Sequence, residues 1–457
     1  MITQQRISVN MTIKKILISL FIIVIALPVS ANSSYMNFDW WKNYNDEILN
    51  QHLENLYKNN HDLKIVAYKT QQAKENIRLI GANQLPHATF NPEFIQEFKG
   101  GAKRFGDLVI PQYSQTDILL PIEASYEVDI WGQNYLNRKS AKKQKEMSEE
   151  DERATYIYIT SSFAANYFNL IRTDELIQNS KNIIEIQTKI VELTQKKYDK
   201  GLCSINELLN EKQLLLENKN KLNKLFENKK VLNNELQNLL GENVERDIEH
   251  AQLTNIHYPK TPDSLSALVI KNRPDLIKSE KYAQKVGLDV RVVKRDFLPK
   301  IILYGNIGFN AYNTGGIFNS NTFLSSVGVL PKFDIFSGGA KLARFRITKI
   351  EYKKSEEIFQ KTLLNGIQEL NDALIQSKTT KTNLKNTNEV LSIEEEKYIL
   401  AQKKYNVGHS SKLDEMKEEI NLLLTKQHQV NAEIDNLITT ITMYNAVGGV
   451  DYNNIDL

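Results

Sequence analysis

The sequence predicts an α+β membrane protein built from two similar halves. Each half is expected to contain one hairpin of long strands and one hairpin of very long helices. Three observations lead to this prediction. Strict polar–apolar alternation indicates strands with one apolar face. Proline-free stretches with an apolar residue at every seventh position indicate coiled-coil helices. Four landmarks that recur in the same order indicate an internal two-fold repeat.

The composition excludes several classes of function. The 457 residues carry a net charge of only +3, so nothing in the charge favours a nucleic-acid partner. Cys203 is the single cysteine, which rules out an intrachain disulfide and a zinc site built on several cysteines. The seven histidines show no metal-ligand spacing, and there is no phosphate-binding loop. We therefore expect neither an enzyme nor a cofactor.

The N-terminus has the pattern of a secretory signal peptide, assigned to residues 1–31. Lys14 and Lys15 precede an apolar run, and the small residues of Val29-Ser30-Ala31 suit signal peptidase. The run of about 12 residues is shorter than the roughly 20 that a spanning helix needs. An uncleaved anchor is the alternative, and translation starts at either Met1 or Met11. No later stretch could span as a helix, so we expect any membrane span to consist of strands.

The landmarks of the repeat occur once in each half. An N-x-x-D-L motif and a Leu-Pro pair recur at an offset of 213, and a Y-x-x-G-x-x-S turn recurs at an offset of 207. A motif of Asp, Ile, an aromatic residue and Gly lies between them. The pairs are 59–63 with 272–276, 85–86 with 298–299, 128–132 with 333–339, and 198–204 with 405–411. We interpret this as duplication of a domain-sized unit.

The alternating stretches follow each Leu-Pro pair. Lys300–Ala311 and Asp117–Ile130 alternate strictly, whereas Ala88–Phe98 and Phe323–Ile335 do so more weakly. Glycine-rich breaks separate the members of each pair. A soluble sandwich would show the same alternation, but about 10 residues per strand suits a tilted transmembrane strand. Four strands cannot close a barrel, because known membrane barrels have at least eight. The chain must therefore oligomerise if these strands span: a dimer would give eight strands and a trimer twelve.

The long helices are expected from about Trp131 to Asp199 and at the corresponding place in the second half. One apolar series runs at seven-residue spacing from Tyr156 to Tyr198, and the other from Leu363 to Tyr405 with Ser377 as its polar member. A helix of about 65 residues is roughly 100 Å long. A second helix of about 35 residues follows each turn.

The two turns can be explained by helix chemistry alone. Gly201 and Gly408 stand where a left-handed residue ends a helix. Ser204 with Glu207, and Ser411 with Asp414, have the spacing of a capping box, in which Asp is expected to fit less well than Glu.

Together, "NRPDLIKSE", "FLPKI", "YEVDIWG", "KFDIFSGG" and the two turns resemble the TolC-type outer-membrane efflux and secretion channel family. The resemblance covers essentially the whole mature chain. It implies a homotrimer whose strands form a 12-strand outer-membrane barrel, continued by a long periplasmic helical tunnel. It also implies a periplasmic adaptor and an inner-membrane pump or ABC exporter as partners. The function implied is the exit duct of a tripartite efflux pump or type I secretion system.

The resemblance assigns roles to the turns. A carboxylate six residues after the second-turn glycine rings the closed aperture in the family, which corresponds to Asp414. Lys417 stands where some members carry a second acid, and it is expected to pair with an acid instead. Capping and aperture roles for Asp414 are compatible, and both stay open. Glu207 is expected mainly to cap, and Cys203 to be incidental. The implied adaptor-docking tips comprise Tyr198, Gly201, Ser204, Glu207, Tyr405, Gly408 and Ser411.

The family's acylated cysteine is missing, so anchoring in the outer membrane would depend on the barrel. The alternative function is a secreted or surface coiled-coil adhesin. The sequence does not predict the cargo. The expected boundaries are a signal peptide 1–31, helices 32–85, a strand hairpin 86–130, a helical hairpin 131–241, a linker with helices 242–298, a strand hairpin 299–336, a helical hairpin 337–449 and a tail 450–457.

Overall fold

The computed structural model describes residues 39–100, 103–106, 108–110, 113–242 and 246–449. The predicted signal peptide and the C-terminal tail lie outside these residues. The α-helices are α2 (Glu47–Asn59), α3 (His61–Ala82), α4 (Gln133–Asp199), α5 (Ile205–Leu240), α6 (Pro274–Arg295), α7 (Ala340–Asn406) and α8 (Lys412–Ala446). Short 3-10 turns are η1 (Trp40–Tyr44), η2 (Leu253–Asn255), η3 (Ala267–Asn272), η4 (Thr314–Gly316) and η5 (Ser320–Thr322).

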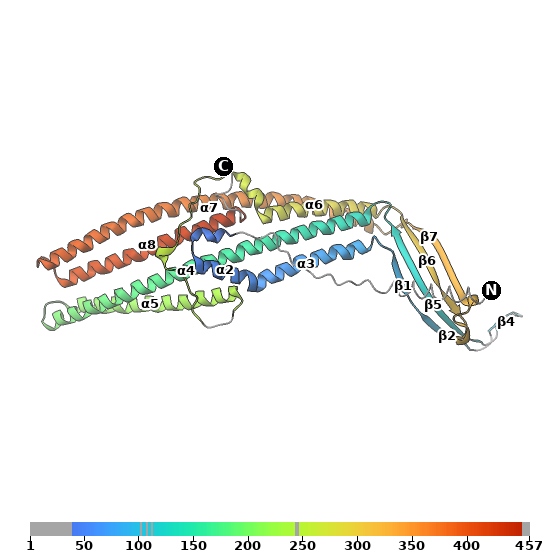
Figure 1. Ribbon diagram of the computed structural model, residues 1–457, viewed down its shortest axis with the longest axis horizontal. Helices are drawn as coiled ribbons and strands as arrows, with labels where there is room; N and C mark the ends of the chain where they lie inside the picture. The colour runs from blue at the N-terminus through green and yellow to red at the C-terminus, as the bar shows by residue number, and fades with distance from the viewer. Residues whose placement is uncertain (1–38, 101–102, 107, 111–112, 243–245, 450–457) are drawn as a thin grey trace, which may run out of the picture. The chain divides into compact units, whose positions relative to one another are not determined.

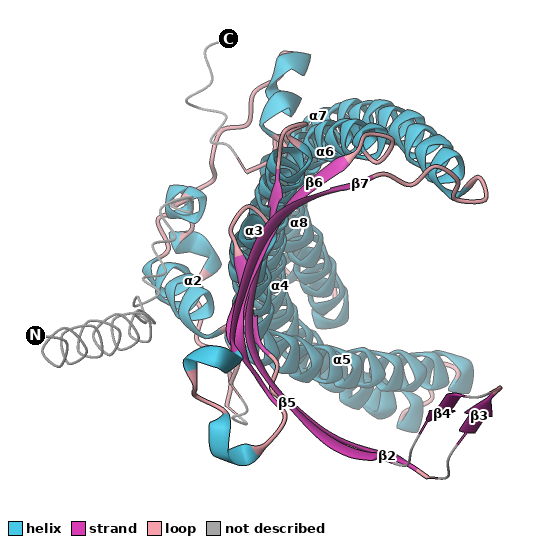
Figure 2. Ribbon diagram, turned by 90° about the vertical axis from the view of Figure 1, so that its right-hand side faces the viewer, coloured by secondary structure: helices cyan, strands magenta, loops and turns pink. Residues whose placement is uncertain are grey.

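The main sheet is antiparallel and open. Its strands are β1 (His87–Phe90), β2 (Glu93–Lys99), β5 (Tyr113–Val128), β6 (Lys300–Ala311) and β7 (Phe323–Lys332). Both β1 and β2 pair with β5, which pairs with β6, which pairs with β7. The sheet is seen as a curved arc in Figure 2. The pairing of β5 with β6 joins the two halves of the chain.

The strands differ from the sequence prediction in four details. The first predicted strand is broken at Asn91-Pro92, where proline cannot donate a ladder hydrogen bond. β5 begins at Tyr113, earlier than predicted, and ends at Val128. The predicted glycine-rich loop after β2 contains a small hairpin, β3 (Lys103–Phe105) with β4 (Leu108–Ile110). Finally, β7 ends at Lys332 and not at Ile335.

The long helices run side by side along the molecule (Figure 1). α4 contacts α3, α6, α5 and α8, and α7 contacts α6 and α8. An aromatic core surrounds the middle of α4, where η1 packs against it: the Trp40 ring stacks on Tyr444 with centroids 4.5 Å apart, and Tyr44 lies 4.9 Å from Phe168. In the described residues, no helix is both long and apolar enough to cross a membrane.

The buried stripe of α4 departs from the predicted seven-residue series. Tyr156, Phe163, Leu170 and Ile177 are buried as predicted. Nearer the turn, however, Ile184 and Val191 are only half-buried, and Ile183, Ile186 and Ile190 take the buried positions. A straight helix drifts by about 20° per heptad against a strict seven-residue repeat. The prediction that the series stays in the core up to Tyr198 was therefore wrong for this part of the helix.

The series on α7 is buried over only a short stretch. Leu370 and the polar member Ser377 are buried, whereas Leu384, Leu391 and Tyr398 are half-buried. The Ser377 hydroxyl lies 2.7 Å from the hydroxyl of Thr261, which satisfies both groups. A hydrogen bond to the segment between η2 and η3 thus accounts for the polar residue in the apolar series.

Candidate aperture and helical tips

The two turns between the long helices have matching geometry. Gly201 and Gly408 adopt φ of 66° and 78°, in the left-handed region that favours glycine. The Gly201 amide donates to the Tyr198 carbonyl at 2.8 Å, and the Gly408 amide donates to the Tyr405 carbonyl at 3.0 Å. The conformation predicted for both glycines is therefore confirmed.

The caps differ between the turns. The Ser204 hydroxyl accepts from the Glu207 amide at 3.2 Å, but the capping box is complete only at the second turn. There the Ser411 hydroxyl accepts from the Asp414 amide at 3.2 Å, and the Ser411 amide donates to Asp414 Oδ2 at 3.0 Å. The expectation that Asp fits the box less well than Glu was wrong. Because both bonds are made by Asp414, the shorter side chain fits this turn.

Asp414 is exposed and ionised by its surroundings. Hydrogen bonds from the Ser411 hydroxyl (2.7 Å) and amide lower the pKa of the Asp414 carboxyl, and the charges of Lys197 and Lys417 lower it further. The carboxylate therefore keeps its charge at neutral pH. Capping and an exposed negative charge coexist in one side chain.

Lys417 pairs with the first half of the chain. Its ammonium lies 2.9 Å from Glu211 Oε1, on α5. The Glu211 side chain is 8% exposed, and its other oxygen accepts from Gln187 Nε2 of α4 at 2.7 Å. The acid that Lys417 was expected to find is thus Glu211, which the sequence could not identify because the partner lies on the other hairpin.

Apolar packing supports this ion pair. Ile186 and Ile190 of α4 form a buried cluster with Leu413 and Met416 of α8. On the other side of α8, the ammonium of Lys412 bonds the buried Glu415 at 2.7 Å and lies 5.0 Å from the centre of the Tyr405 ring. The start of α8 is thus held against both hairpins.

The tips also expose large apolar side chains. Tyr198 and Tyr405 are 40% and 38% exposed, although both end a predicted core series. Leu202 and Val407 are more exposed still, at 71% and 68%. Exposed apolar groups at the end of a long helical hairpin are typical of a contact surface.

A second group of residues was missed by the sequence analysis. Arg273, 7% exposed, donates from Nη1 to the Ala446 carbonyl at 3.1 Å and pairs bidentately with Asp275. Its Nη2 also lies 2.6 Å from Glu369 Oε2 of α7. In the first half, Asn60 Nδ2 donates to the Leu239 carbonyl at 2.7 Å. In both halves, therefore, the N-x-x-D-L motif ties the C-terminal end of the second long helix to the start of another helix.

A family model described as "Outer membrane efflux protein" matches residues 52–242 and 265–449. The chain belongs to the outer membrane efflux protein family. It is an outer-membrane efflux channel of the kind found in tripartite systems, with a large periplasmic part. The resemblance suggested by the motifs is confirmed, and the family match favours the channel over the adhesin.

Curated relatives are similar along most of their length. The chain is 23% identical over 427 residues to the Escherichia coli K12 cation efflux system protein CusC, covering 92% of this chain and 91% of CusC. It is 21% identical over 413 residues to the pyoverdine export outer membrane protein OpmQ of Pseudomonas putida, covering 90% of this chain and 87% of OpmQ. The two names refer to different cargoes, so identity at this level does not indicate the cargo.

Solved structures show the same fold. The Campylobacter jejuni CmeC outer membrane channel superposes with a TM-score of 0.82 at 22% identity, covering 94% of this chain and 92% of CmeC. The Vibrio cholerae outer membrane protein VceC gives a TM-score of 0.78 at 20% identity, covering 90% and 98%. The efflux protein thus shares the whole fold of these proteins, both helices and sheet.

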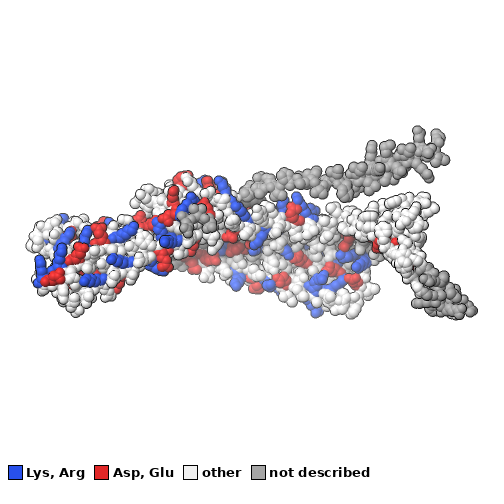
Figure 3. Space-filling view, turned by 90° about the horizontal axis from the view of Figure 1, so that it is seen from below, with Lys and Arg blue, Asp and Glu red and all other residues white. Residues whose placement is uncertain are grey.

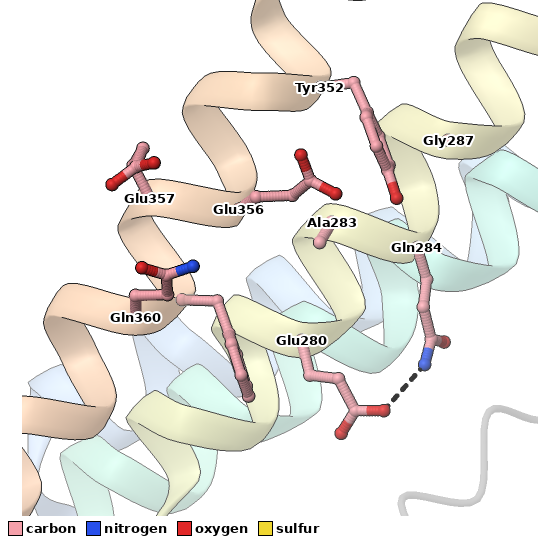
Figure 4. Close-up of a pocket in the computed structure, with 9 residues that line it drawn as sticks. Glu280, Ala283, Gln284, Gly287, Tyr352, Glu356, Glu357 and Gln360 are labelled. Carbon is pink, nitrogen blue, oxygen red and sulfur yellow. Dashed lines mark hydrogen bonds between the residues drawn. The ribbon is translucent and has the colours of Figure 1, made fainter.

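One groove of the efflux protein lies away from the tips, between α6 and α7 (Figure 4). Glu280, Ala283, Gln284 and Gly287 of α6 and Tyr352, Glu356 and Gln360 of α7 are among the lining residues, and Gln284 Nε2 donates to Glu280 Oε1 at 2.8 Å. The described residues contain no group of three or more His, Cys, Asp or Glu side chains placed to hold a metal ion.

Proposed function

We propose that three copies of this chain form a passive exit duct. Each copy would supply four strands to a 12-strand outer-membrane barrel, with β1 and β2 together counted as one because both pair with β5. Its long helices would contribute to a periplasmic tunnel. We assign residues 86–130 and 299–336 to the barrel, and 131–241 and 337–449 to the tunnel. The observation that carries the proposal is an open, curved sheet with one apolar face, one polar face and two unpaired edges.

The faces of the sheet follow from its register. Residues directly opposite one another share a face, so Ile122, Ile307 and Ser325 lie on one side, as do Tyr126, Leu303 and Val329. Ile118 and Ala311 at one end of this face are buried, but many of its other apolar side chains are exposed; among them Val327 is 90% and Phe94 68% exposed. On the side seen in Figure 3, the strand region is largely free of charge, while acidic and basic residues alternate along the helices. An apolar outer face suits lipid contact.

The opposite face carries the polar side chains. Glu123 lies opposite Asn306, which lies opposite Ser326, and Lys300 pairs with Glu127 at 3.1 Å. This face would line a water-filled lumen. In the described residues, the edges at β1–β2 and β7 have no strand partner, so copies joined edge to edge would close the barrel and satisfy the backbone groups.

The helices support the same assembly. At 1.5 Å per residue, the 67 residues of α4 or α7 span about 100 Å, a length suited to a conduit. Both α7 and α5 expose apolar side chains that a neighbouring copy would cover: Leu342, Ile347, Ile350, Leu364, Ile375 and Val390 on α7, and Leu209, Leu214, Leu216, Phe226 and Val231 on α5.

The tips would form the aperture and the docking surface. Three copies of Asp414 near the axis would attract cations, and the Lys417–Glu211 pair would hold the aperture closed. The exposed Tyr198, Leu202, Tyr405 and Val407 would contact a periplasmic adaptor. With no phosphate-binding loop in the sequence, energy would come from an inner-membrane pump or ABC exporter bound to that adaptor.

Conductance and mass test this proposal. Purified protein in a planar bilayer should conduct cations in preference to anions, and light scattering in detergent should give the mass of three chains. A monomer, or a protein that conducts nothing after reconstitution, would contradict the proposal. In whole cells, the helices should be protected from external protease.

A further inference from the structure

The two unpaired edges of the sheet can be matched through the internal repeat. The sequence landmarks recur at two offsets, 213 and 207. If 213 is added to residue numbers in β1 and β2, and 207 to those in β5, the pairing of β1 with β5 is converted into the pairing of β6 with β7. His87 opposite Ser125 becomes Lys300 opposite Lys332, and Thr89 opposite Glu123 becomes Ile302 opposite Leu330. Both converted pairs are present in the sheet. The register of the strands therefore follows the repeat.

The helices support the offset of 207 for β7. Gly132 and Gly339, the left-handed residues before α4 and α7, differ by this number, and both helices have 67 residues. The match of Asp129 with Asp334 would instead give an offset of 205. The observed pairing decides against 205, because His87 opposite Ser125 would then become Lys300 opposite Leu330, whereas Lys300 lies opposite Lys332.

Among the strands that the structure describes, the pairing of β5 with β6 has no counterpart, which would join β7 to β1 and β2. Converted by the same offsets, Glu123 opposite Asn306 becomes Leu330 opposite Glu93, and Val128 opposite Ile301 becomes Ile335 opposite Ala88. We propose that β7 of one copy pairs in this register with β1 and β2 of a second copy. The proposal rests on the trimer proposed above and specifies its strand interface.

This register explains why β7 is shorter than the sequence predicts. β5 continues to Val128, beyond Ser125 where its pairing with β1 ends, because β6 pairs with it there. The counterpart of Ser125 is Lys332, where β7 ends. The next residues include Phe333 and Ile335, which are 56% and 91% exposed and pair with no strand in the described part of the chain. In the assembly, β1 of a second copy would extend β7 to Ile335.

The charges at the edges agree with the same register. Lys300 and Glu127 form an ion pair at 3.1 Å across β6 and β5. Their counterparts are His87 and Asp334, again a nitrogen donor and a carboxylate. Asp334 is 54% exposed and bonds Lys341 at 3.2 Å within the chain. A second copy would bring His87 to the free side of this carboxylate.

Cysteine cross-linking tests the register. In a Cys203→Ser background, Leu330→Cys is combined with Asn91→Cys, Glu93→Cys or Ile95→Cys. These three positions are every second residue along the edge that would face β7. Directly opposite Cβ atoms are about 5 Å apart, against about 7–8 Å for diagonal neighbours. Oxidation should give covalently linked chains on a denaturing gel, with the highest yield for Glu93.

The outcomes separate the two proposals. A highest yield with Asn91 would establish the offset of 205 and overturn the register, as would a highest yield with Ile95. Absence of cross-links in a protein with the mass of three chains would overturn the strand interface while the trimer stands. A monomer would overturn both.

A charge exchange tests the ion pair separately. Asp334→Lys should lower the temperature at which the trimer dissociates, and addition of His87→Glu should restore it. Asp334→Asn is the control, because it removes the bond to Lys341 without placing a cation opposite His87. If the double variant dissociates at the same temperature as Asp334→Lys alone, the proposed pair of His87 with Asp334 is overturned.

Discussion

Lys417 and Glu211, 2.9 Å apart, connect the two helical hairpins a few residues from their turns. The carboxylate is buried and the ammonium is half-exposed, so the pair closes the edge of an apolar contact between α4 and α8. Any movement that separates the hairpins must leave Glu211 without its cation.

Replacing Lys417 should loosen this contact. Lys417→Ala leaves a buried carboxylate with Gln187 as its remaining side-chain donor, which costs about 1 kcal/mol, the lower end of the range for an unsatisfied buried group. We expect higher single-channel conductance and a lower melting temperature. Lys404→Ala, at an exposed position before the second turn, is the control. Equal conductance in the two variants would contradict a closing role for the pair.

Two substitutions should separate the capping role of Asp414 from its proposed role at the aperture. Asp414→Asn removes the charge and keeps an oxygen acceptor, whereas Asp414→Ala removes both. We expect both variants to weaken block of conductance by divalent cations. Only Asp414→Ala should also lose stability, by about 1 kcal/mol or less. If divalent cations block the Asp414→Asn variant as strongly as wild type, Asp414 acts only as a helix cap.

His250 should give the efflux protein a pH-dependent stability. Its Nε2 bonds Asp174 of α4 at 2.8 Å, and this bond raises the pKa of the imidazole despite partial burial. The charged form is thus favoured in the folded state. The resulting stability is fully present below the unfolded pKa of about 6.5 and is lost as pH rises through the raised pKa.

The measurement compares melting temperatures of wild type and His250→Gln. The difference should be larger at about pH 6 than at about pH 9, because the pair with Asp174 is charged only at the lower pH. His61→Gln, at the exposed start of α3, provides the control. A difference that stays constant between these pH values would exclude the titration of His250 as its source.

The N-x-x-D-L clamps should differ in strength. Arg273→Ala removes the guanidinium that donates to the Ala446 carbonyl, while Asp275 and Glu369 are half-exposed and can be hydrated, so the cost should be about 1.5–3 kcal/mol, the range for hydrogen bonds to charged groups. Arg273→Lys should recover only part of this, because an ammonium lacks the bidentate fork. Asn60→Ala, the counterpart in the first half, should cost about 1–2 kcal/mol. Chemical unfolding in detergent measures all three.

The sequence predicted local structure well and pairing between distant segments poorly. The helix ends were found because glycine and serine at the turns determine them: Gly201 and Gly408 alone place both turns. β6 was predicted to the residue, since alternation and its flanking proline are local signals. By contrast, the partner of Lys417 lies on α5, and no local pattern indicates it.

The same distinction explains the misses. The N-x-x-D-L motif was recognised as a landmark, but its function as a clamp depends on the Ala446 and Leu239 carbonyls far along the chain. The seven-residue series of α4 leaves the buried stripe at Ile184, because a straight helix drifts against a strict seven-residue repeat. The predicted end of β7 at Ile335 was wrong, because no described strand pairs with the residues after Lys332; the proposed partner is β1 of a second copy.

The open sheet also has a consequence for biogenesis. A newly exported copy carries an exposed apolar face and two bare strand edges through an aqueous compartment, and such edges template aggregation. If the chain assembles as proposed, escort by a holding factor or rapid capture by other copies would precede insertion. Production of the protein should therefore fail first by aggregation when its synthesis outruns assembly, and substitutions at the β7 edge should lower the yield before they alter transport.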